Sequence, residues 1–250
     1  MPKFFYGILI SIIALIILFF IFQPFDSSSS SSEESSFSSE DPTDSSDQAS
    51  YPTIILDAGH GGFDPGKVGI NGVLEKDINL SIVKKLQILL EEKGFTIYLT
   101  RDSDTILAPA NSKRPKMDDM IARVEMVKEI NPYFTISIHQ NSFTSPDIKG
   151  PQVFFYKDSV ESATMAQVIQ DAMNRYLEPQ KSRVAQANSN YYLLTRTPTP
   201  TVIVECGFLS NPSEADLLAT EDYQLKVANA IYMGILSYYE ATTSTQTLSE

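Results

Sequence analysis

The 250-residue chain contains only two histidines, and each one directly follows a short apolar run. His60 comes after the run at residues 53–59, and His139 comes after the run at residues 134–138. Apolar runs of this length predict strands, and strand ends that open into loops are where α/β proteins build their sites. The placement suggests one metal ion shared by both imidazoles. It is also compatible with two unrelated, partly buried histidines.

A carboxylate could complete such a metal site. Glu75 lies fifteen residues after His60, at the start of a predicted helix. Two imidazoles and one carboxylate with an open fourth position form a known catalytic zinc arrangement. An acid at a helix start is also stabilised by the helix dipole and by free N–H groups, so a purely structural role for Glu75 stays open.

A second carboxylate, Glu205, follows the apolar run at residues 201–204. A charge at the mouth of a buried strand is unfavourable unless it is paired or functional. Near a water molecule activated by zinc, Glu205 could act as a general base. Spacing alone supports these roles weakly, because the chain has no short HExxH-type motif.

Strand-like and helix-like segments alternate after residue 50. The predicted strands are residues 53–56, 95–100, 133–138, 152–156, 191–194 and 201–205. The predicted helices are residues 75–93, 118–130, 159–177 and 222–239, with Asp118 and Asp119 capping the second and Leu225 and Met233 on the apolar side of the last. The alternation predicts one α/β domain with helices on both faces of a sheet. It places His60, His139 and Glu205 at strand ends.

The first 25 residues are predicted to be a membrane anchor or signal segment. Residues 4–22 are apolar and uncharged, and as a helix they would span about 28 Å, close to the ~30 Å hydrocarbon core of a bilayer. Lys3 precedes them and only acids follow closely, which predicts a cytoplasmic N-terminus and an extracytoplasmic domain. Bulky residues at the end of the run favour an uncleaved anchor over a signal peptide, whose cleavage would release a secreted protein.

Residues 26–50 contain thirteen serines and seven acids, a composition that predicts a disordered linker. Residues 51–250 are long enough for one substantial catalytic domain. This domain has 24 acidic and 18 basic residues, and a net charge of −6 argues against nucleic acid as a partner. The single cysteine, Cys206, excludes an internal disulfide.

Four segments resemble, in order, motifs of the zinc-dependent N-acetylmuramoyl-L-alanine amidases. They are IILDAGHGG at residues 54–62, LEKD at 74–77, SIHQNS at 137–142 and VECGFLSNP at 204–212. The resemblance implies that His60, Glu75 and His139 bind one Zn²⁺ and that Glu205 is catalytic. It implies hydrolysis of the amide between the lactyl group of N-acetylmuramic acid and L-alanine of the peptidoglycan stem peptide. It also implies a twisted mixed sheet of about six strands.

Within this family the chain most resembles the germination-specific, spore-cortex type. That type is short, has an N-terminal membrane segment and carries a basic stretch like the one at residues 112–116. It strips stem peptides so that muramic-δ-lactam can form. Some relatives insert a self-blocking helix where this chain has only residues 143–150, so we expect control by a regulatory protein partner or by expression.

Three further residues are candidates for binding substrate. Arg101 and Arg123 could pair with a peptide carboxylate, although an ordinary salt bridge is the simpler role for each. Asn141 could orient His139 or the substrate, or it could cap a loop. Tyr191, Tyr192 and the loop at residues 177–190 could line a groove.

Two other functions compete with the amidase prediction. One is a non-catalytic peptidoglycan-binding protein of the same fold, which the retained Glu205 argues against. The other is a zinc peptidase that cuts within the stem peptide, which the four ordered motifs argue against.

Overall fold

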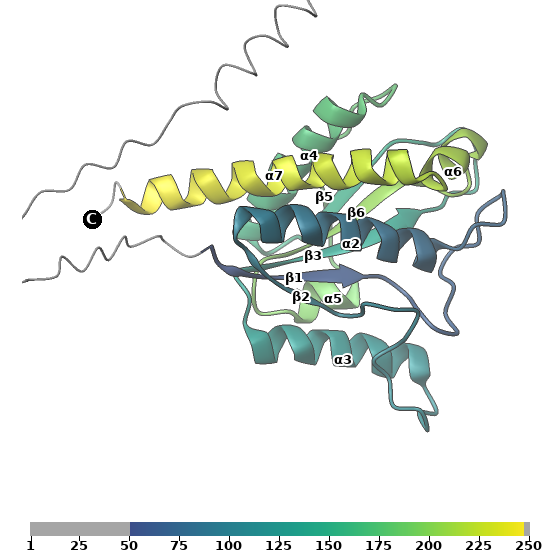
Figure 1. Ribbon diagram of the computed structural model, residues 1–250, viewed down its shortest axis with the longest axis horizontal. Helices are drawn as coiled ribbons and strands as arrows, with labels where there is room; N and C mark the ends of the chain where they lie inside the picture. The colour runs from purple at the N-terminus through teal and green to yellow at the C-terminus, as the bar shows by residue number, and fades with distance from the viewer. Residues whose placement is uncertain (1–50, 248–250) are drawn as a thin grey trace, which may run out of the picture. The chain divides into compact units, whose positions relative to one another are not determined.

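The computed structural model describes residues 51–247 (Figure 1). The predicted anchor at residues 1–25 and the predicted linker at residues 26–50 lie outside the described residues. Within residues 51–247, no helix combines the length and the apolar character needed to cross a membrane.

A six-stranded mixed sheet forms the centre of the domain. Its strands are β1 (Thr53–Ala58), β2 (Thr96–Leu99), β3 (Phe134–Asn141), β4 (Gln152–Tyr156), β5 (Gln186–Asn188) and β6 (Thr201–Phe208). Their order is β2-β1-β3-β6-β4-β5. The pairs among β2, β1, β3 and β6 are parallel, β4 runs antiparallel to β6, and β5 runs parallel to β4. The predicted mixed sheet of about six strands is confirmed.

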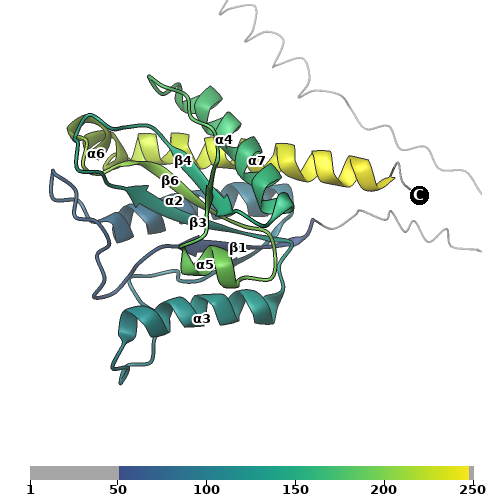
Figure 2. The ribbon, with the colours of Figure 1, turned by 180° about the vertical axis from the view of Figure 1, so that it is seen from behind.

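Helices cover both faces of the sheet, as predicted. They are α2 (Glu75–Lys93), α3 (Pro115–Ile130), α4 (Val160–Leu177), α5 (Tyr192–Arg196), α6 (Pro212–Leu218) and α7 (Glu221–Thr247). The long helices α2, α4 and α7 pack together on one face, while α3 and α5 contact each other on the opposite face (Figures 1 and 2).

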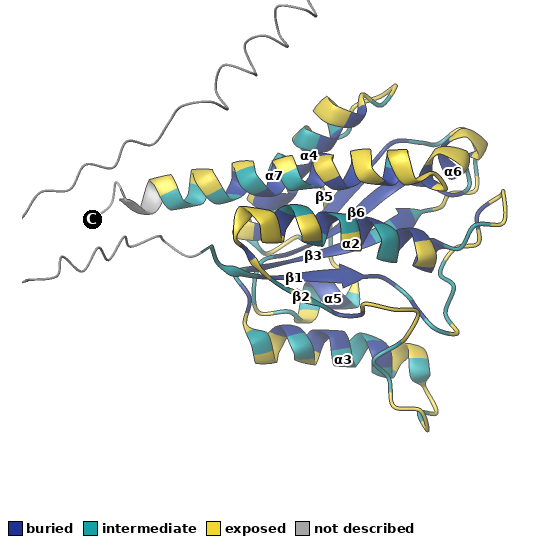
Figure 3. Ribbon diagram, in the orientation of Figure 1, coloured by how far each residue is buried: buried dark blue, intermediate teal, exposed yellow. Residues whose placement is uncertain are grey.

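The central strands are buried on both faces, as Figure 3 shows in dark blue. Alternate side chains of β3 divide between these faces, because a strand has a two-residue repeat. Phe134, Ile136 and Ile138 pack in the main core beneath α2, α4 and α7. Ser137 and His139 therefore point toward the opposite face, where the site is built.

Helix α2 begins and ends as predicted. Its buried stripe contains Ile78, Ile82, Leu86 and Leu90. Gly94 follows it with φ 108°, a left-handed conformation that glycine adopts without a steric penalty.

Several predicted elements are wrong in detail. Residues 192–194 belong to the short helix α5 rather than a strand, with Tyr191 as its N-cap, because a four-residue apolar run does not distinguish the two. The edge strand β5 and the helix α6 were not predicted. Helix α3 begins at Pro115, a residue suited to a first helical position, and neither Asp118 nor Asp119 caps it.

The final helix also differs from its prediction. Helix α7 runs to Thr247, beyond the predicted end at residue 239. Leu225 and Met233, predicted to face the core, are 44% and 36% exposed. The buried stripe of α7 instead contains Val227, Ala228, Ala230, Ile231 and Ile235.

Candidate active site

Three side chains predicted to bind metal lie together at the carboxyl ends of β1 and β3. The Nε2 atom of His60 lies 3.2 Å from Oε1 of Glu75, and Nδ1 of His139 lies 2.9 Å from the same oxygen. One ligand atom from each residue falls within 4.8 Å of the other two. Two imidazole nitrogens and a carboxylate oxygen at this spacing suit a tetrahedral zinc ion with one open position.

Each ligand comes from a different element. His60 lies in the loop after β1 with φ 62°, an uncommon conformation for a residue with a side chain. Glu75 is the first residue of α2, as predicted. His139 lies within β3, which continues to Asn141, so its predicted place at the strand end is wrong by two residues.

Two glycines make room for the ligands. A Cβ atom on Gly59 would lie 2.2 Å from the His139 ring, and one on Gly66 would lie 2.6 Å from both Glu75 Oε2 and His60 Cδ2. Real Cβ atoms do not approach other atoms so closely. The absence of side chains at these positions is therefore a condition for the cluster.

Arg123 holds the loop that carries His60. Its guanidinium donates to the carbonyls of Ala58 and His60, each at 2.9 Å, and pairs with the carboxylates of Asp57 and Asp119. The residue is 1% exposed. Its predicted contact with substrate is therefore wrong, because every edge of the guanidinium faces protein, and the ion-pair alternative is what the structure shows.

Arg101 acts on the same loop. It donates to the carbonyl of Ala58 at 2.9 Å, to that of Gly59 at 3.1 Å and to that of Lys76 at 2.7 Å. It is 4% exposed, so the predicted substrate contact does not fit this residue either. Together the two arginines satisfy the carbonyls of three consecutive residues, 58–60, which stabilises the conformation that His60 requires.

Hydrogen bonds from residues outside the cluster orient the side chains of His60 and Glu75. Nδ1 of His60 donates to Oδ2 of Asp64 at 3.0 Å, which leaves Nε2 directed at Glu75. Glu75 accepts from the main-chain N–H of Lys67 at 2.7 Å and from that of Gln140 at 3.1 Å. Such outer partners fix the orientation of metal ligands. The role of Asp64 was not predicted, although an acid four residues after a histidine that binds metal could have suggested a hydrogen-bond partner for that histidine.

Glu75 and His60 carry opposite charges in the metal-free cluster, and a metal ion would take the place of the proton on His60. Burial alone would raise the pKa of Glu75, but hydrogen bonds from His139 and His60 outweigh it and hold that pKa well below its usual range. Burial alone would lower the pKa of His60, but Glu75 and Asp64 raise it to about 9. The carboxylate is therefore ionised at neutral pH and attracts positive charge to the site.

Glu205 lies beside this cluster. It pairs in register with His139 across the parallel strands β3 and β6. It lies inside β6, which continues to Phe208, so its predicted place at the strand end is wrong. Glu205 is 8% exposed, and its Oε2 atom meets no hydrogen-bond partner within residues 51–247. Burial, reinforced by the negative charge of Glu75, raises its pKa to about 7 against the opposing effect of the imidazoles.

A cavity of about 100 Å³ opens between Glu205, His139 and helix α5, with Tyr191 and Tyr192 among its walls. A buried carboxylate with a free oxygen and a pKa near neutrality can take up and return a proton. The arrangement is thus a candidate metal centre with a candidate general base at its edge.

Comparison with known proteins decides the family. The profile of the N-acetylmuramoyl-L-alanine amidase family (Amidase_3) matches residues 54–237, which is most of the chain. The chain belongs to the N-acetylmuramoyl-L-alanine amidase family. It is therefore an enzyme of that activity, as the ordered motifs predicted.

This amidase resembles a germination-specific N-acetylmuramoyl-L-alanine amidase of Bacillus subtilis with 42% identity over 189 residues, covering 74% of this chain and 79% of that protein. It also resembles the CwlD amidase of Clostridioides difficile, solved in complex with the GerS lipoprotein, at 38% identity and a TM-score of 0.74 over 76% of this chain and 99% of that one. The AmiC2 amidase of Nostoc punctiforme matches at 31% identity and a TM-score of 0.66, over 75% and 97% of the two chains.

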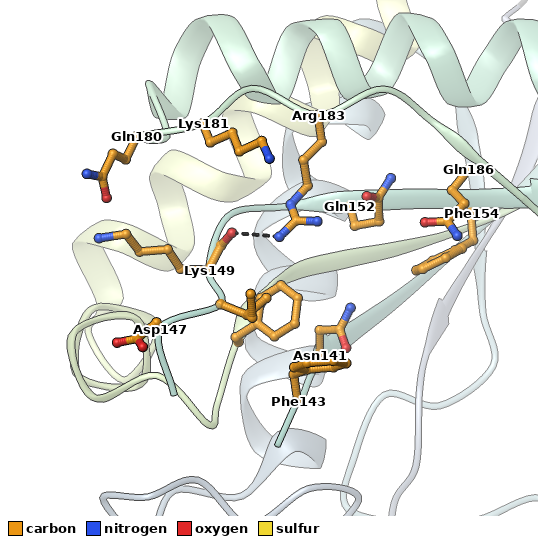
Figure 4. Close-up of a pocket in the computed structure, with 12 residues that line it drawn as sticks. Asn141, Phe143, Asp147, Lys149, Gln152, Phe154, Gln180, Lys181, Arg183 and Gln186 are labelled. Atoms are coloured by element: carbon orange, nitrogen blue, oxygen red, sulfur yellow. Dashed lines mark hydrogen bonds between the residues drawn. The ribbon is translucent and has the colours of Figure 1, made fainter. Parts of the chain in front are cut away.

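A large groove of the amidase is lined by residues of β4 and of the ends of β3 and β6 (Figure 4). It has a volume of about 840 Å³, and its walls include Asn141, Gln152, Phe154 and Phe208. Asn141, a predicted substrate residue, thus lies in the groove, and its Oδ1 also accepts from the N–H of Ser142 at 2.7 Å. This hydrogen bond is the loop-capping role, and contact of Asn141 with substrate or with His139 stays a prediction.

Proposed function

We propose that this amidase uses a zinc ion held by His60, Glu75 and His139 to hydrolyse the amide between N-acetylmuramic acid and L-alanine of the stem peptide. The observation that carries the proposal is the three-donor cluster, whose ligand atoms lie within 4.8 Å of one another, beside the unpaired Oε2 of Glu205. The donor set fits zinc, because two imidazoles and one carboxylate leave a fourth position open once the metal has displaced the proton of His60.

When bound, zinc would supply a Lewis acid for the scissile carbonyl and would make water more acidic. Glu205 would take the proton of the attacking water on Oε2 and return it to the L-alanine nitrogen as the amide breaks. Its pKa of about 7 suits both steps, since a group that must accept and then donate a proton works best near the operating pH. The acidic carboxylate of Glu75 stays ionised throughout and serves as a ligand.

The substrate we propose is peptidoglycan of the spore cortex, where removal of stem peptides would permit formation of muramic-δ-lactam. The similarity to a germination-specific amidase supports this assignment. A regulatory protein partner is also part of the proposal, because a similar amidase was solved in complex with a lipoprotein.

We further propose that the enzyme works outside the cytoplasm, tethered by residues 1–25 through the linker at residues 26–50. The apolar run at residues 4–22 and the serine-rich, acidic composition that follows support this arrangement. Intact-protein mass measurement of the membrane fraction tests it. Loss of residues 1–25 from the mature protein would replace the anchor with a secreted form.

Digestion of purified peptidoglycan, followed by mass spectrometry, tests the reaction itself. We expect free stem peptides that begin with L-alanine, their release to stop on chelation, and activity to return with zinc. Products cut inside the peptide would identify a peptidase instead. Binding to peptidoglycan without any released product would identify a binding protein of the same fold.

A further inference from the structure

The large groove is lined by residues that pair with, or lie close to, Glu205 and His139 in the sheet. Gln152 of β4 pairs in register with Glu205 of β6, and Asn141 pairs with Phe208 after an irregularity in the register of β3 and β6. Residues paired in register point to the same face of a sheet. Groove residues Gln152, Asn141 and Phe208 therefore share a face with His139 and Glu205, so a chain bound at the metal ligands can continue into the groove.

The far wall of the groove lies at a distance that suits a short peptide. The Gln152 side chain donates from Nε2 to the carbonyl of Val184 at 2.8 Å, which places the segment around Arg183 directly beyond β4. With strands about 4.8 Å apart, this wall lies roughly 10 Å from Glu205. An extended peptide covers that distance in about three residues.

The charge of the groove opposes that of the domain. Lys149, Lys181 and Arg183 line it with one acid, Asp147, although residues 51–250 carry a net charge of −6. A further acid behind the wall, Glu214, is engaged by two main-chain N–H groups at 2.8 Å. A local excess of cations in an acidic domain indicates an anionic ligand.

Arg183 is the best-placed of the three cations. It projects into the groove between Lys149 and Gln152 (Figure 4). One Nη atom donates to the carbonyl of Lys149 at 3.0 Å, and the guanidinium lies 5.5 Å from the ring centre of Phe208, so its plane is held in position. Its Nε atom is buried, so a ligand in the groove would meet the Nη atoms and not Nε. The planar, charged guanidinium of an arginine that lines a groove matches a carboxylate.

We infer that this groove binds a free carboxylate of the stem peptide, two to three residues beyond the scissile amide, with Arg183 as its main partner and Lys149 and Lys181 beside it. The inference rests on the proposed function and makes it more specific, because it assigns a preference for acidic over amidated stem peptides. Phe143, Phe154 and Phe208 give the groove apolar walls for the peptide's uncharged parts.

A matched pair of ligands tests the inference. The probes are a synthetic N-acetylmuramoyl tripeptide with free carboxylates on its second and third residues and its fully amidated twin. Dissociation constants are measured on the zinc-supplemented full chain carrying Glu205→Gln, which prevents turnover. We expect the acidic ligand to bind about 10- to 100-fold more tightly than its twin.

Charge-matched variants locate the effect. Arg183→Gln should abolish the difference between the two ligands, whereas Arg175→Gln, an exposed arginine of α4 outside the groove, should leave it unchanged. Lys181 is exposed, so Lys181→Gln reports on the same site through a smaller loss even where Arg183→Gln does not fold. Equal affinities for the two ligands, or a preference that survives both groove variants, would overturn the inference.

Two outcomes separate this inference from neighbouring ones. If polyglycerol phosphate competes at Arg183 while the two peptides bind equally, the groove serves a phosphate polymer and the inference is wrong. Product analysis with the unmodified chain is independent of these affinities. If the chain prefers the acidic ligand but releases no L-alanyl peptide, the carboxylate site in the groove is supported and the proposed reaction is refuted.

Discussion

Glu205 combines two properties that rarely occur together in a folded protein. It is nearly fully buried, and one of its oxygens meets no donor within residues 51–247. An unpaired buried carboxylate destabilises a fold, so a role in the reaction is the simplest reason for its presence. The consequences can be measured separately for activity and for stability.

Replacing the carboxylate should stop catalysis without loss of the metal. Glu205→Gln keeps the size of the side chain and removes the proton acceptor, so we expect hydrolysis to fall about 10²- to 10⁴-fold. Zinc content, measured by elemental analysis, should stay at one ion per chain because Glu205 is outside the three-donor cluster. Full activity in the variant would remove Glu205 from the mechanism.

The same variant should stabilise the metal-free protein at high pH. The pKa of Glu205 is about 7 in the folded state against 4.5 for an ordinary glutamate, so folding favours its protonated form. Below about pH 4.5 both states hold the proton and no penalty arises. Between about pH 4.5 and 7 the unfolded state loses this proton while the folded state keeps it, so the penalty on folding grows to about 3 kcal/mol and stays constant at higher pH.

Urea unfolding of both proteins in a chelator measures this difference. Glu205→Gln should raise the free energy of unfolding clearly at pH 8 and little at pH 5. An equal gain at both pH values would mean that the charge of Glu205 is not the cause.

At the scale of the element, the backbone conformation of the loop after β1 depends on side chains from other segments more than on the loop's own residues. Its carbonyls are satisfied by Arg101 and Arg123 from separate segments, and its ligand His60 holds a left-handed backbone conformation. Strain of this kind persists where the surrounding structure determines it. Replacing the side chains that hold this loop should therefore weaken metal binding.

Arg123 is the clearest case. Arg123→Met removes the partner of the buried Asp57, whose pKa is lowered to about 2 because Arg123 and a hydrogen bond from Ser137 outweigh burial. Breaking a buried ion pair on one side costs about 3–5 kcal/mol, so we expect a loss of that size in urea unfolding, together with weaker zinc binding. Arg114→Met, which removes an exposed pair with Asp118, should cost about 1 kcal/mol or less. Comparable losses in the two variants would contradict this account.

Gly59 gives a second prediction at this scale. Gly59→Ala puts a methyl group against the His139 ring, which must move, so zinc affinity should fall by at least about 10-fold. Gly72→Ala is the control: its backbone is also strained for alanine at φ 86°, but no atom lies within 4 Å of the added Cβ. It should lower stability modestly, by about 1 to 2 kcal/mol, and keep zinc affinity. Isothermal titration with zinc compares them.

At the scale of the whole molecule, the metal would join parts of the chain that are far apart in sequence. The ligands come from a loop at residue 60, a helix at residue 75 and a central strand at residue 139. A ligand that binds the folded state alone stabilises it by mass action, by about 4 kcal/mol when its free concentration is 1,000 times the dissociation constant.

Chelation should therefore lower the midpoint of thermal unfolding as well as activity, and added zinc should restore both. His139→Gln, which leaves His60 as the chain's other histidine, should show the lower midpoint with or without zinc. If zinc does not change the midpoint of thermal unfolding of the unmodified protein, that result would argue against this metal centre.

Much of the architecture could be predicted because it follows from local pattern. The stripe of α2, the stop at Gly94 and the apolar runs of β1 and β3 depend on neighbouring residues alone. The short apolar run at residues 191–194 could not be assigned, since its periodicity fits a helix and a strand equally well. Edge strand β5 has no apolar pattern and forms only because β4 supplies its partners.

The sequence by itself determined which side chains were available: two histidines, Glu75 and Glu205 in ordered motifs around an α/β pattern. Only the tertiary structure decided what each arginine does, because burial and hydrogen-bond partners depend on segments distant in the chain. Arg101 and Arg123 became supports of the His60 loop, and Arg183, which no motif singled out, became one of the cations that line the groove. Residue type sets the chemistry that is available, and packing decides where it is used.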